Sequence, residues 1–305
     1  MTELGRHAAL VGATASGKSA LALALARRDP SWELVSVDSM QVYRRMDIGT
    51  AKPTPAEQAE VPHHLIDLLE PWEDGTVAWF QREARRVIAD IEARGKRALL
   101  VGGTGLYLQA VVDDLDIPGQ YPEARAEIEA DLDTAALHRR LGELDPLAAS
   151  RMEVGNRRRI VRALEVTVGS GRPFSSYGPG LDARRPTPFR LVGIARAPED
   201  LTARIEARYG SQMAAGFLDE VAALRNDGRG ISRTAAQALG YKELLAHLDG
   251  ELTLDEALDL AVRRTRQFAR RQRAWFRRDP RIHWVDVSEA ADDNLLVDAA
   301  ASAVG

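Results

Sequence analysis

The 305-residue sequence contains no cysteine, which excludes disulfide bonds, thiolate metal sites and a cysteine nucleophile. Aromatic residues are also scarce, at 6% of the chain, and we expect them in the core rather than on a base-stacking surface. Long hydrophobic runs are missing as well. The longest all-apolar run, residues 20–26, is too short to span a bilayer, and residues 1–7 lack the basic and apolar regions of a signal peptide. We therefore expect a cytoplasmic protein without a membrane partner.

The chain does contain an ordinary globular composition with unevenly placed charge. Its apolar content is 45%, and its length suits one large domain or a domain with a second one inserted. The formal charge of −4 argues against a nucleic-acid partner only if charge is spread evenly. Arginines cluster, however, in residues 157–162 and 263–278. Such helices can be solvated faces paired to acids, but two blocks in an acidic chain favour a polyanion, and guanidinium groups suit RNA.

The most specific motif is Gly12-Ala-Thr-Ala-Ser-Gly17-Lys18-Ser19, which has the spacing of a phosphate-binding P-loop. It follows an apolar run and precedes an Ala/Leu-rich run, as a loop between a strand and a helix does. The glycines let successive N–H groups point at phosphate oxygens, Lys18 adds positive charge, and Ser19 offers a hydroxyl to Mg²⁺. The predicted phosphate-binding residues are Gly12, Ala13, Thr14, Ala15, Ser16, Gly17, Lys18 and Ser19, with Ser19 as the metal ligand. The motif alone does not decide which phosphate compound it holds.

Strands and helices alternate along the first part of the chain. Strand patterns cover residues 7–11, 34–37, 63–69, 97–101 and 189–195. This alternation predicts an α/β fold, with a P-loop parallel-sheet core, helices on both faces and a small inserted all-helical domain. The expected boundaries are 1–118 for the first part of the core, 119–187 for the helical insertion, and 188–305 for a mostly helical continuation. The tail over residues 290–305 is weakly patterned, and we expect it to pack loosely or fray.

Polar residues follow two of these strands at the edge where ligands bind in parallel sheets. Asp38 is compatible with three roles: a Mg²⁺ ligand, a general base, or a structural cap for the next turn. The segment Gly102-Gly-Thr104-Gly brings a hydroxyl and free N–H groups to the same edge, or simply makes a tight turn. His63 and His64 are adjacent and point to opposite faces of a strand, so we expect no metal there.

Taken together, the segments resemble the bacterial tRNA dimethylallyltransferase (IPP transferase) family, in that family's order from residue 8 to about residue 285. The resemblance rests on the P-loop together with Asp38-Ser-Met-Gln-Val-Tyr43, Asp47-Ile-Gly-Thr-Ala-Lys-Pro53, His63-His-Leu-Ile-Asp67, Gly102-Gly-Thr-Gly-Leu-Tyr107, Arg159-Ile-Val-Arg-Ala-Leu-Glu165, Gly240-Tyr-Lys-Glu243, Thr265-Arg-Gln-Phe-Ala-Arg-Arg-Gln272 and Trp275-Phe-Arg277.

The resemblance implies transfer of the dimethylallyl group of dimethylallyl diphosphate to N6 of adenosine 37 in tRNAs that read codons beginning with U. Mg²⁺ is the implied cofactor, and no ATP is consumed. Asp38 would be the general base, Thr104 would position substrate or diphosphate, and Arg208, with Arg204 kept open, would contact the leaving pyrophosphate. The implied tRNA-contacting residues are Asp38, Ser39, Met40, Gln41, Thr104, Arg125, Arg158, Arg159, Ile160, Val161, Arg162, Gln237, Ala238, Leu239, Gly240, Tyr241, Lys242, Arg270, Arg271, Gln272, Arg273, Trp275 and Arg277.

Three other functions stay open at this point. A P-loop kinase or NTPase would use Lys18 to hold ATP, and a non-catalytic RNA-binding protein would rely on residues 263–278. An adenylate isopentenyltransferase would share the prenyl donor and differ in the acceptor. The two basic blocks favour tRNA over a free nucleotide, because AMP needs few phosphate contacts. We expect a monomer.

Overall fold

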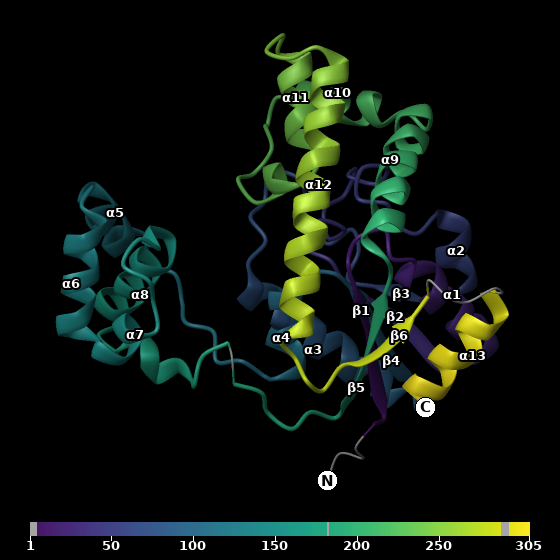
Figure 1. The fold of residues 1–305 in the computed structure, drawn as a ribbon, viewed down its shortest axis with the longest axis horizontal. Coiled ribbons are helices and arrows are strands. Elements are labelled where there is room, and N and C mark those ends of the chain that lie inside the picture. Colours follow the sequence, from purple (N-terminus) through teal and green to yellow (C-terminus); the bar gives the residue numbers. More distant parts are fainter. Residues whose placement is uncertain (1–4, 182, 288–292) are drawn as a thin grey trace. The chain divides into compact units, whose positions relative to one another are not determined.

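The computed structural model describes residues 5–181, 183–287 and 293–305 (Figure 1). The chain forms two compact units. Met1–Val112 and Pro186–Gly305 make the first, which we call the core unit, and Asp113–Arg185 make the second, the helical unit. Within the described ranges, no helix is long and apolar enough to cross a membrane.

The core unit is built on a six-stranded sheet in the order β3-β2-β4-β1-β5-β6, with every neighbouring pair parallel. The strands are β1 (His7–Gly12), β2 (Trp32–Val37), β3 (His63–His64), β4 (Arg97–Gly102), β5 (Phe189–Ala195) and β6 (His283–Asp286). Gly102 is in register with Val11 of β1 and Val37 of β2, so these three strands end at one edge of the sheet. The predicted parallel α/β fold is confirmed.

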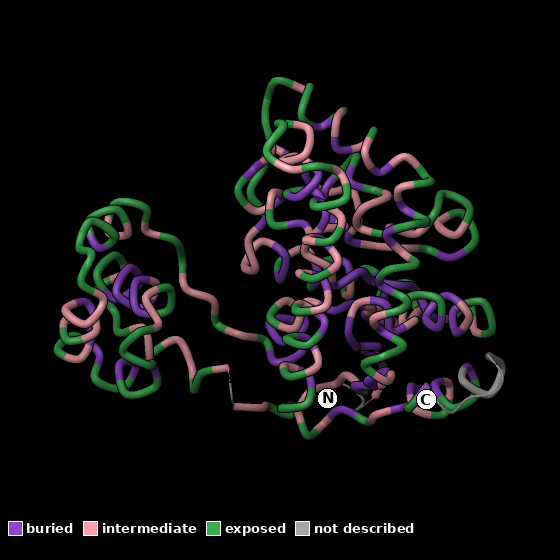
Figure 2. Tube along the Cα trace, turned by 45° about the horizontal axis from the view of Figure 1, so that its top comes forward, coloured by how far each residue is buried: buried purple, intermediate pink, exposed green. Residues whose placement is uncertain are grey.

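Helices cover both faces of this sheet because successive strand residues point to opposite sides. Ala8 and Leu10 face a core that includes α1 (Lys18–Arg28) and α13 (Asp293–Val304), whereas Ala9 and Val11 face the larger second core. That second core includes α3 (Val77–Ala93), α4 (Gly105–Val112), α9 (Pro198–Ala214), α10 (Phe217–Asn226), α11 (Tyr241–Leu248) and α12 (Leu254–Arg277). A short helix α2 (Pro55–Glu60) and a 3₁₀ turn (Ala235–Gln237) complete the unit. In Figure 2 the buried residues gather in the interior, and β1 and β2 are buried along their whole length.

The helical unit has its own buried core. It comprises α5 (Pro122–Ala130), α6 (Thr134–Leu144), α7 (Pro146–Ser150), α8 (Arg157–Ser170) and a 3₁₀ turn (Phe174–Tyr177). Ile128, Leu141 and Ile160, one from each longer helix, are fully buried together. The short helix α7 begins where the side chain of Asp145 accepts the N–H of Ala148 at 3.0 Å.

Two expectations for the core unit are wrong. The strand predicted over residues 63–69 is limited to His63–His64, because Leu65 and Asp67 adopt positive φ angles of 62° and 54°, which turn the chain out of the sheet. The tail predicted to pack loosely forms α13 over Asp293–Val304 instead. Its residues Val297, Ala300 and Val304 are buried in the core beneath α1, which holds the helix in place. Residues 290–292 of that prediction lie outside the described residues.

Candidate functional site

The P-loop connects β1 to α1 with a tightly turned backbone. Ala15 and Gly17 have positive φ angles of 64° and 96°, and the N–H of Ser16 donates to Ala13 O at 3.2 Å. A Cβ on Gly12 would lie 2.9 Å from Ser16 Oγ and 3.0 Å from Ile194 O, so a larger residue does not fit there. Because α1 begins at Lys18, its unpaired N–H groups and the positive end of its dipole add to the loop amides. This geometry suits an anion.

Three arginines that follow β5 in the chain donate hydrogen bonds to the P-loop. Arg208 Nη1 donates to Thr14 Oγ1 at 2.9 Å, Arg204 Nε to Ala15 O at 2.8 Å, and Arg196 Nε to Ser16 O at 3.3 Å. Arg204 and Arg208 lie one turn apart on α9, so both candidates for the diphosphate contact touch the loop. Arg196 was missed from the sequence, although it directly follows β5 at the edge where ligands bind.

Gln272, on α12, braces the loop against the neighbouring strand. Its Oε1 accepts the N–H of Thr14 at 2.8 Å, and its Nε2 donates to Gly103 O at 2.9 Å. A Cβ on Gly103 would lie 2.2 Å from that Nε2, and one on Gly105 would lie 2.3 Å from the Trp275 ring. The glycines after β4 therefore let α12 approach closely enough for Gln272 to bridge the two loops.

Asp38 follows β2 at the same edge. One of its carboxylate oxygens, Oδ1, accepts the N–H of Met40 at 2.8 Å. Thr104 Oγ1 accepts the N–H of Ser39 at 3.3 Å, which ties the turn after β2 to the loop after β4. The structure thus brings Asp38 and Thr104, residues 66 positions apart in the chain, to adjacent turns beside the P-loop.

The charges of these groups act on one another. Burial of the Lys18 ammonium and, next, the charge of Arg208 lower the pKa of Lys18 to about 8, while Asp38 opposes the shift. Burial also lowers the pKa of Arg208, with a further contribution from Arg204. On the other side, burial raises the pKa of Tyr107 on α4 to about 12, with Tyr43 and Asp38 adding to it. Positive charge is therefore concentrated and poorly solvated here, and a bound anion would stabilise it.

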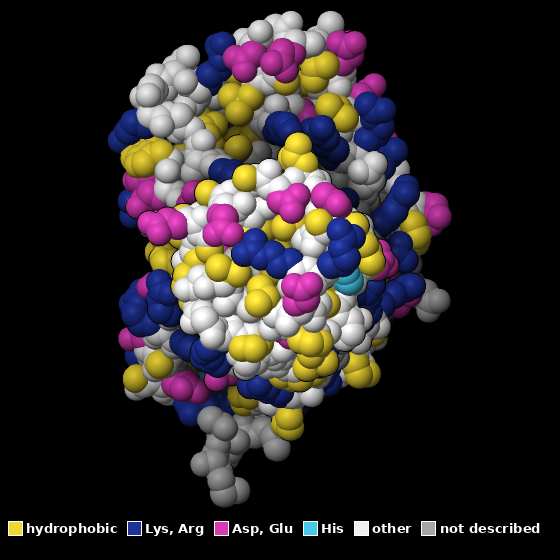
Figure 3. All heavy atoms as spheres, turned by 90° about the vertical axis from the view of Figure 1, so that its left-hand side faces the viewer, with side chains coloured by type: hydrophobic (Ala, Val, Ile, Leu, Met, Phe, Trp, Pro, Cys, Tyr) yellow, Lys and Arg dark blue, Asp and Glu magenta, His cyan; other side chains and the backbone are white. Residues whose placement is uncertain are grey.

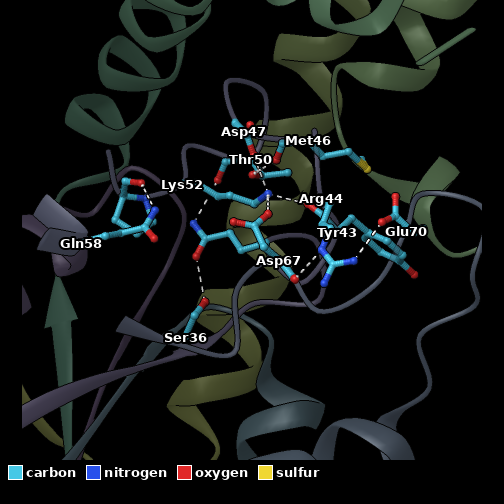
Figure 4. A network of polar contacts seen from close by, with 12 residues as sticks. Ser36, Tyr43, Arg44, Met46, Asp47, Thr50, Lys52, Gln58, Asp67 and Glu70 are labelled. Atoms are coloured by element: carbon cyan, nitrogen blue, oxygen red, sulfur yellow. Dashed lines mark hydrogen bonds and ion pairs between the residues drawn. The ribbon is translucent and has the colours of Figure 1, made fainter. Parts of the chain in front are cut away.

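A polar network fixes the segment that follows Asp38 (Figure 4). The Gln41 amide donates to Thr50 O at 3.2 Å and Ala51 O at 3.1 Å, and its oxygen accepts from Ser36 Oγ at 2.8 Å. Lys52, whose side chain is only 3% exposed, donates to Tyr43 O and to the carboxylates of Asp47 and Asp67. The side chain of Gln41 consequently has one fixed orientation in this structure.

The residues that the resemblance assigns to tRNA differ in exposure. Exposed ones are Arg158, Arg159, Gln237, Lys242, Arg270, Arg271 and Arg277, and partly buried ones are Asp38, Ser39, Met40, Gln41, Thr104, Arg125, Arg162, Leu239, Arg273 and Trp275. Buried ones are Ile160, Val161, Ala238, Gly240, Tyr241 and Gln272. The side chains of this last set are not accessible to an RNA here, because they pack in the cores or, for Gln272, brace the P-loop.

Two of the arginines in the helical unit are engaged inside it. Arg125 and Arg162 donate to Glu165 at 3.2 and 2.7 Å, and the side chain of Glu165 is only 2% exposed. They neutralise a buried carboxylate, so breaking either pair would leave a costly buried charge. On the face of the helical unit shown in Figure 3, basic, acidic and apolar side chains intermingle.

The protein contributes few ligands to a metal. Among the described residues, no group of three or more His, Asp or Glu side chains is arranged to hold a metal ion. Ser19 is exposed in the first turn of α1, next to the loop amides. Mg²⁺ commonly takes one or two protein oxygens and completes its shell with water and substrate phosphates. The Ser19 hydroxyl is therefore suited to be one oxygen ligand of a Mg²⁺ ion that binds together with phosphate groups.

Comparison with known proteins decides the family. The model of the IPP transferase family matches residues 41–279, well over half of the chain. The chain belongs to this family. The match begins just after Asp38, so the P-loop precedes the matched part.

Close relatives extend the similarity to the P-loop. The tRNA dimethylallyltransferase of Kineococcus radiotolerans is 50% identical over 292 residues, covering 93% of this chain and 92% of the relative. That of Nocardioides is 48% identical over 299 residues, covering 97% and 94%. Among solved structures, the tRNA isopentenylpyrophosphate transferase of Bacillus halodurans is 37% identical with a TM-score of 0.72, covering 98% of this chain and 95% of that one. A eukaryotic dimethylallyltransferase acting on tRNA is 26% identical with a TM-score of 0.76, covering 93% and 74%. The resemblance inferred from the sequence is confirmed.

Proposed function

We propose that this member of the IPP transferase family moves the dimethylallyl group of dimethylallyl diphosphate to N6 of adenosine 37 in tRNAs that read codons beginning with U, and releases diphosphate. The shared name of its relatives supports a tRNA dimethylallyl transfer. The observation that carries the proposal is geometric: the P-loop follows β1 and Asp38 follows β2, and both strands end in register with Gly102 at one edge of the sheet. A base next to a diphosphate site is what prenylation of an amine needs.

Asp38 acts as the general base. The lone pair of N6 attacks C1 of the allyl group, the C1–O bond breaks, and its electrons leave with the diphosphate. The N6 amine is conjugated with the purine and is a weak nucleophile, so transferring its proton to a carboxylate during attack lowers the barrier. The hydrogen bond from the Met40 N–H to Oδ1 orients this carboxylate. Thr104, tied to the Ser39 amide, positions the substrates beside it.

The P-loop and its arginines stabilise the leaving group. The diphosphate gains negative charge as the C1–O bond breaks, and Lys18, Arg208 and the loop amides face that charge in a poorly hydrated site. Arg204 and Arg196 hold the loop carbonyls from outside and keep the amides pointing inward. Bound Mg²⁺, with Ser19 as its protein ligand, would neutralise further charge on the diphosphate.

For the acceptor, the reaction requires that adenosine 37 be unstacked and that the protein bind the RNA backbone. N6 of a stacked adenosine is not accessible to a side chain in the core, so the base must turn out of its stack. Ser39, Met40 and Gln41 follow Asp38 directly and would contact it there. On α12, Arg270, Arg271 and Arg277 are exposed and suited to phosphate groups. Arg158, Arg159, Gln237 and Lys242 are further exposed candidates.

The test is a transfer assay with labelled dimethylallyl diphosphate, Mg²⁺ and an unmodified tRNA carrying A36-A37-A38. We expect label on the tRNA with A37, and none on a matched transcript in which guanosine replaces A37. Absence of label on both would contradict the proposal. Two parallel incubations separate the alternatives. With ATP, nucleotide hydrolysis in place of prenyl transfer would indicate a P-loop NTPase. With AMP and the labelled donor, label on AMP in place of tRNA would indicate an adenylate isopentenyltransferase.

A further inference from the structure

A single carboxylate on α10 holds the backbone of residues 47–49. Glu220 Oε2 accepts the N–H groups of Asp47 and Ile48, both at 2.8 Å, and Oε1 accepts the N–H of Gly49 at 3.2 Å. The Tyr241 hydroxyl donates to the same Oε1 at 2.6 Å. Proteins often bind anions with successive backbone N–H groups that point at one site. Here the anion bound in this way is the protein's own Glu220 carboxylate.

The helices of the core unit hold this segment from the other side as well. Gln212 of α9 donates its amide N–H groups to Ile48 O at 2.6 Å and Gly49 O at 3.1 Å. A Cβ on Gly49 would lie 2.2 Å from the Phe217 ring and 2.4 Å from the Tyr241 ring, so the backbone lies directly on this aromatic pair. The amides and carbonyls of residues 48 and 49 are therefore all bound by α9 and α10.

The same segment then holds Gln41. The next two carbonyls, of Thr50 and Ala51, accept the amide N–H groups of Gln41. Gln41 lies three residues after Asp38, in the turn proposed to meet the adenosine. Hydrogen bonds thus connect Glu220 to Gln41 through one short stretch of backbone that contains no regular secondary structure.

We propose that Glu220 is a positioning residue for the acceptor: it holds residues 47–51 so that Gln41 and the turn after Asp38 present a fixed surface to the tRNA adenosine, without touching the substrate. This inference rests on the function proposed above. It concerns the acceptor and not the donor, because Glu220 hydrogen-bonds to residues 47–49 and Tyr241. The P-loop is held by other residues, namely Arg196, Arg204, Arg208 and Gln272.

The carboxylate is required chemically, because four donors converge on it. A glutamine would place an NH₂ group against N–H donors and leave at least one of them unsatisfied, with the segment free to move. Burial and the Glu220 charge raise the pKa of Tyr241 well above its ordinary value, so its hydroxyl remains a donor. For Glu220→Gln we expect the KM for tRNA to rise about tenfold, as the loss of one such contact implies, with the KM for dimethylallyl diphosphate within about twofold of wild type.

The experiment compares wild type, Glu220→Gln and the matched variant Glu251→Gln, which changes an exposed glutamate just after α11. Both KM values and kcat are measured, and hydrogen exchange is followed in peptides covering residues 46–53 and, for reference, β1. The expected result is a raised KM for tRNA and faster exchange in residues 46–53 for Glu220→Gln alone. A purely structural role would lower kcat through a smaller active fraction and leave both KM values unchanged, which would overturn the inference. So would a parallel rise in the donor KM.

Two further measurements test the inference if Glu220→Gln does not fold or if wild type is inactive. If Glu220→Gln does not fold, Tyr241→Phe removes one donor from the carboxylate while keeping the ring under Gly49, and we expect its KM for tRNA to rise about two- to fivefold. An unchanged value would contradict the inference. If wild type itself transfers no prenyl group, the proposed function fails separately. Titration of an anticodon stem-loop RNA then tests Glu220, because weaker binding by Glu220→Gln supports the positioning role and equal binding refutes it.

Discussion

Replacement of Gln272 by leucine tests whether this residue braces the P-loop or contacts tRNA. The side chain is 6% exposed, and its amide satisfies Thr14 N–H at 2.8 Å and Gly103 C=O at 2.9 Å. Leucine preserves most of the volume and leaves both backbone groups without that partner. Each unsatisfied buried group costs about 1–3 kcal/mol. The Thr14 N–H is only partly buried, so water can replace part of the hydrogen bond that it loses. We therefore expect the free energy of unfolding to fall by about 2–4 kcal/mol.

The substitution should impair binding of the prenyl donor and not binding of tRNA. Without Gln272 the P-loop loses its link to the loop after β4, so we expect a raised KM for dimethylallyl diphosphate and an unchanged affinity for tRNA. Urea unfolding, monitored by tryptophan fluorescence, measures the free energy of unfolding. Steady-state kinetics give the KM for dimethylallyl diphosphate, and a binding titration gives the affinity for tRNA. Gln267→Leu, at an exposed position of the same helix, is the control and should leave all three quantities unchanged. Unaltered stability combined with weaker tRNA binding for Gln272→Leu would refute the bracing role.

Four other substitutions have defined outcomes. Asp38→Asn removes the base, and kcat should fall about 10²–10⁴-fold in the transfer assay with tRNA affinity retained; a rate near wild type would exclude the role of a base. Arg208→Lys keeps the charge and loses the planar fork, so the KM for the donor should rise about tenfold in steady-state kinetics while the KM for tRNA stays the same, and equal effects on both would contradict its assignment to the donor. Gly102→Ala would place a Cβ 2.0 Å from Val37 O, and urea unfolding should show a loss of about 3 kcal/mol or more. Gly210→Ala, in α9 with no heavy atom within 4 Å of the added Cβ, should instead stabilise by about 0.5–1 kcal/mol, and similar effects of the two changes would refute the steric argument.

The sequence by itself determined the features that depend on local geometry. The P-loop is recognisable because its glycine spacing and the lysine that follows are requirements of one continuous turn. Strand β5 coincides with the predicted residues 189–195, because a short apolar run between a loop and a helix has few alternatives. The same regularities were sufficient for the α/β class.

Only the tertiary structure decided which distant residues meet and what they do there. Gln272 contacts Thr14 across 258 positions of the chain, and neither residue carries a local signal of that partnership. Glu220 appears in sequence as one of several acids on an amphipathic helix, and its four donors come from two other segments. Helix α13 has weak patterning, yet the surface beneath α1 is complementary to its small apolar side chains. Local backbone preferences act between neighbours in the chain, whereas hydrogen-bond partners and burial depend on how the strands and helices pack. The P-loop could therefore be recognised from the sequence, but the residues that hold it in place could not.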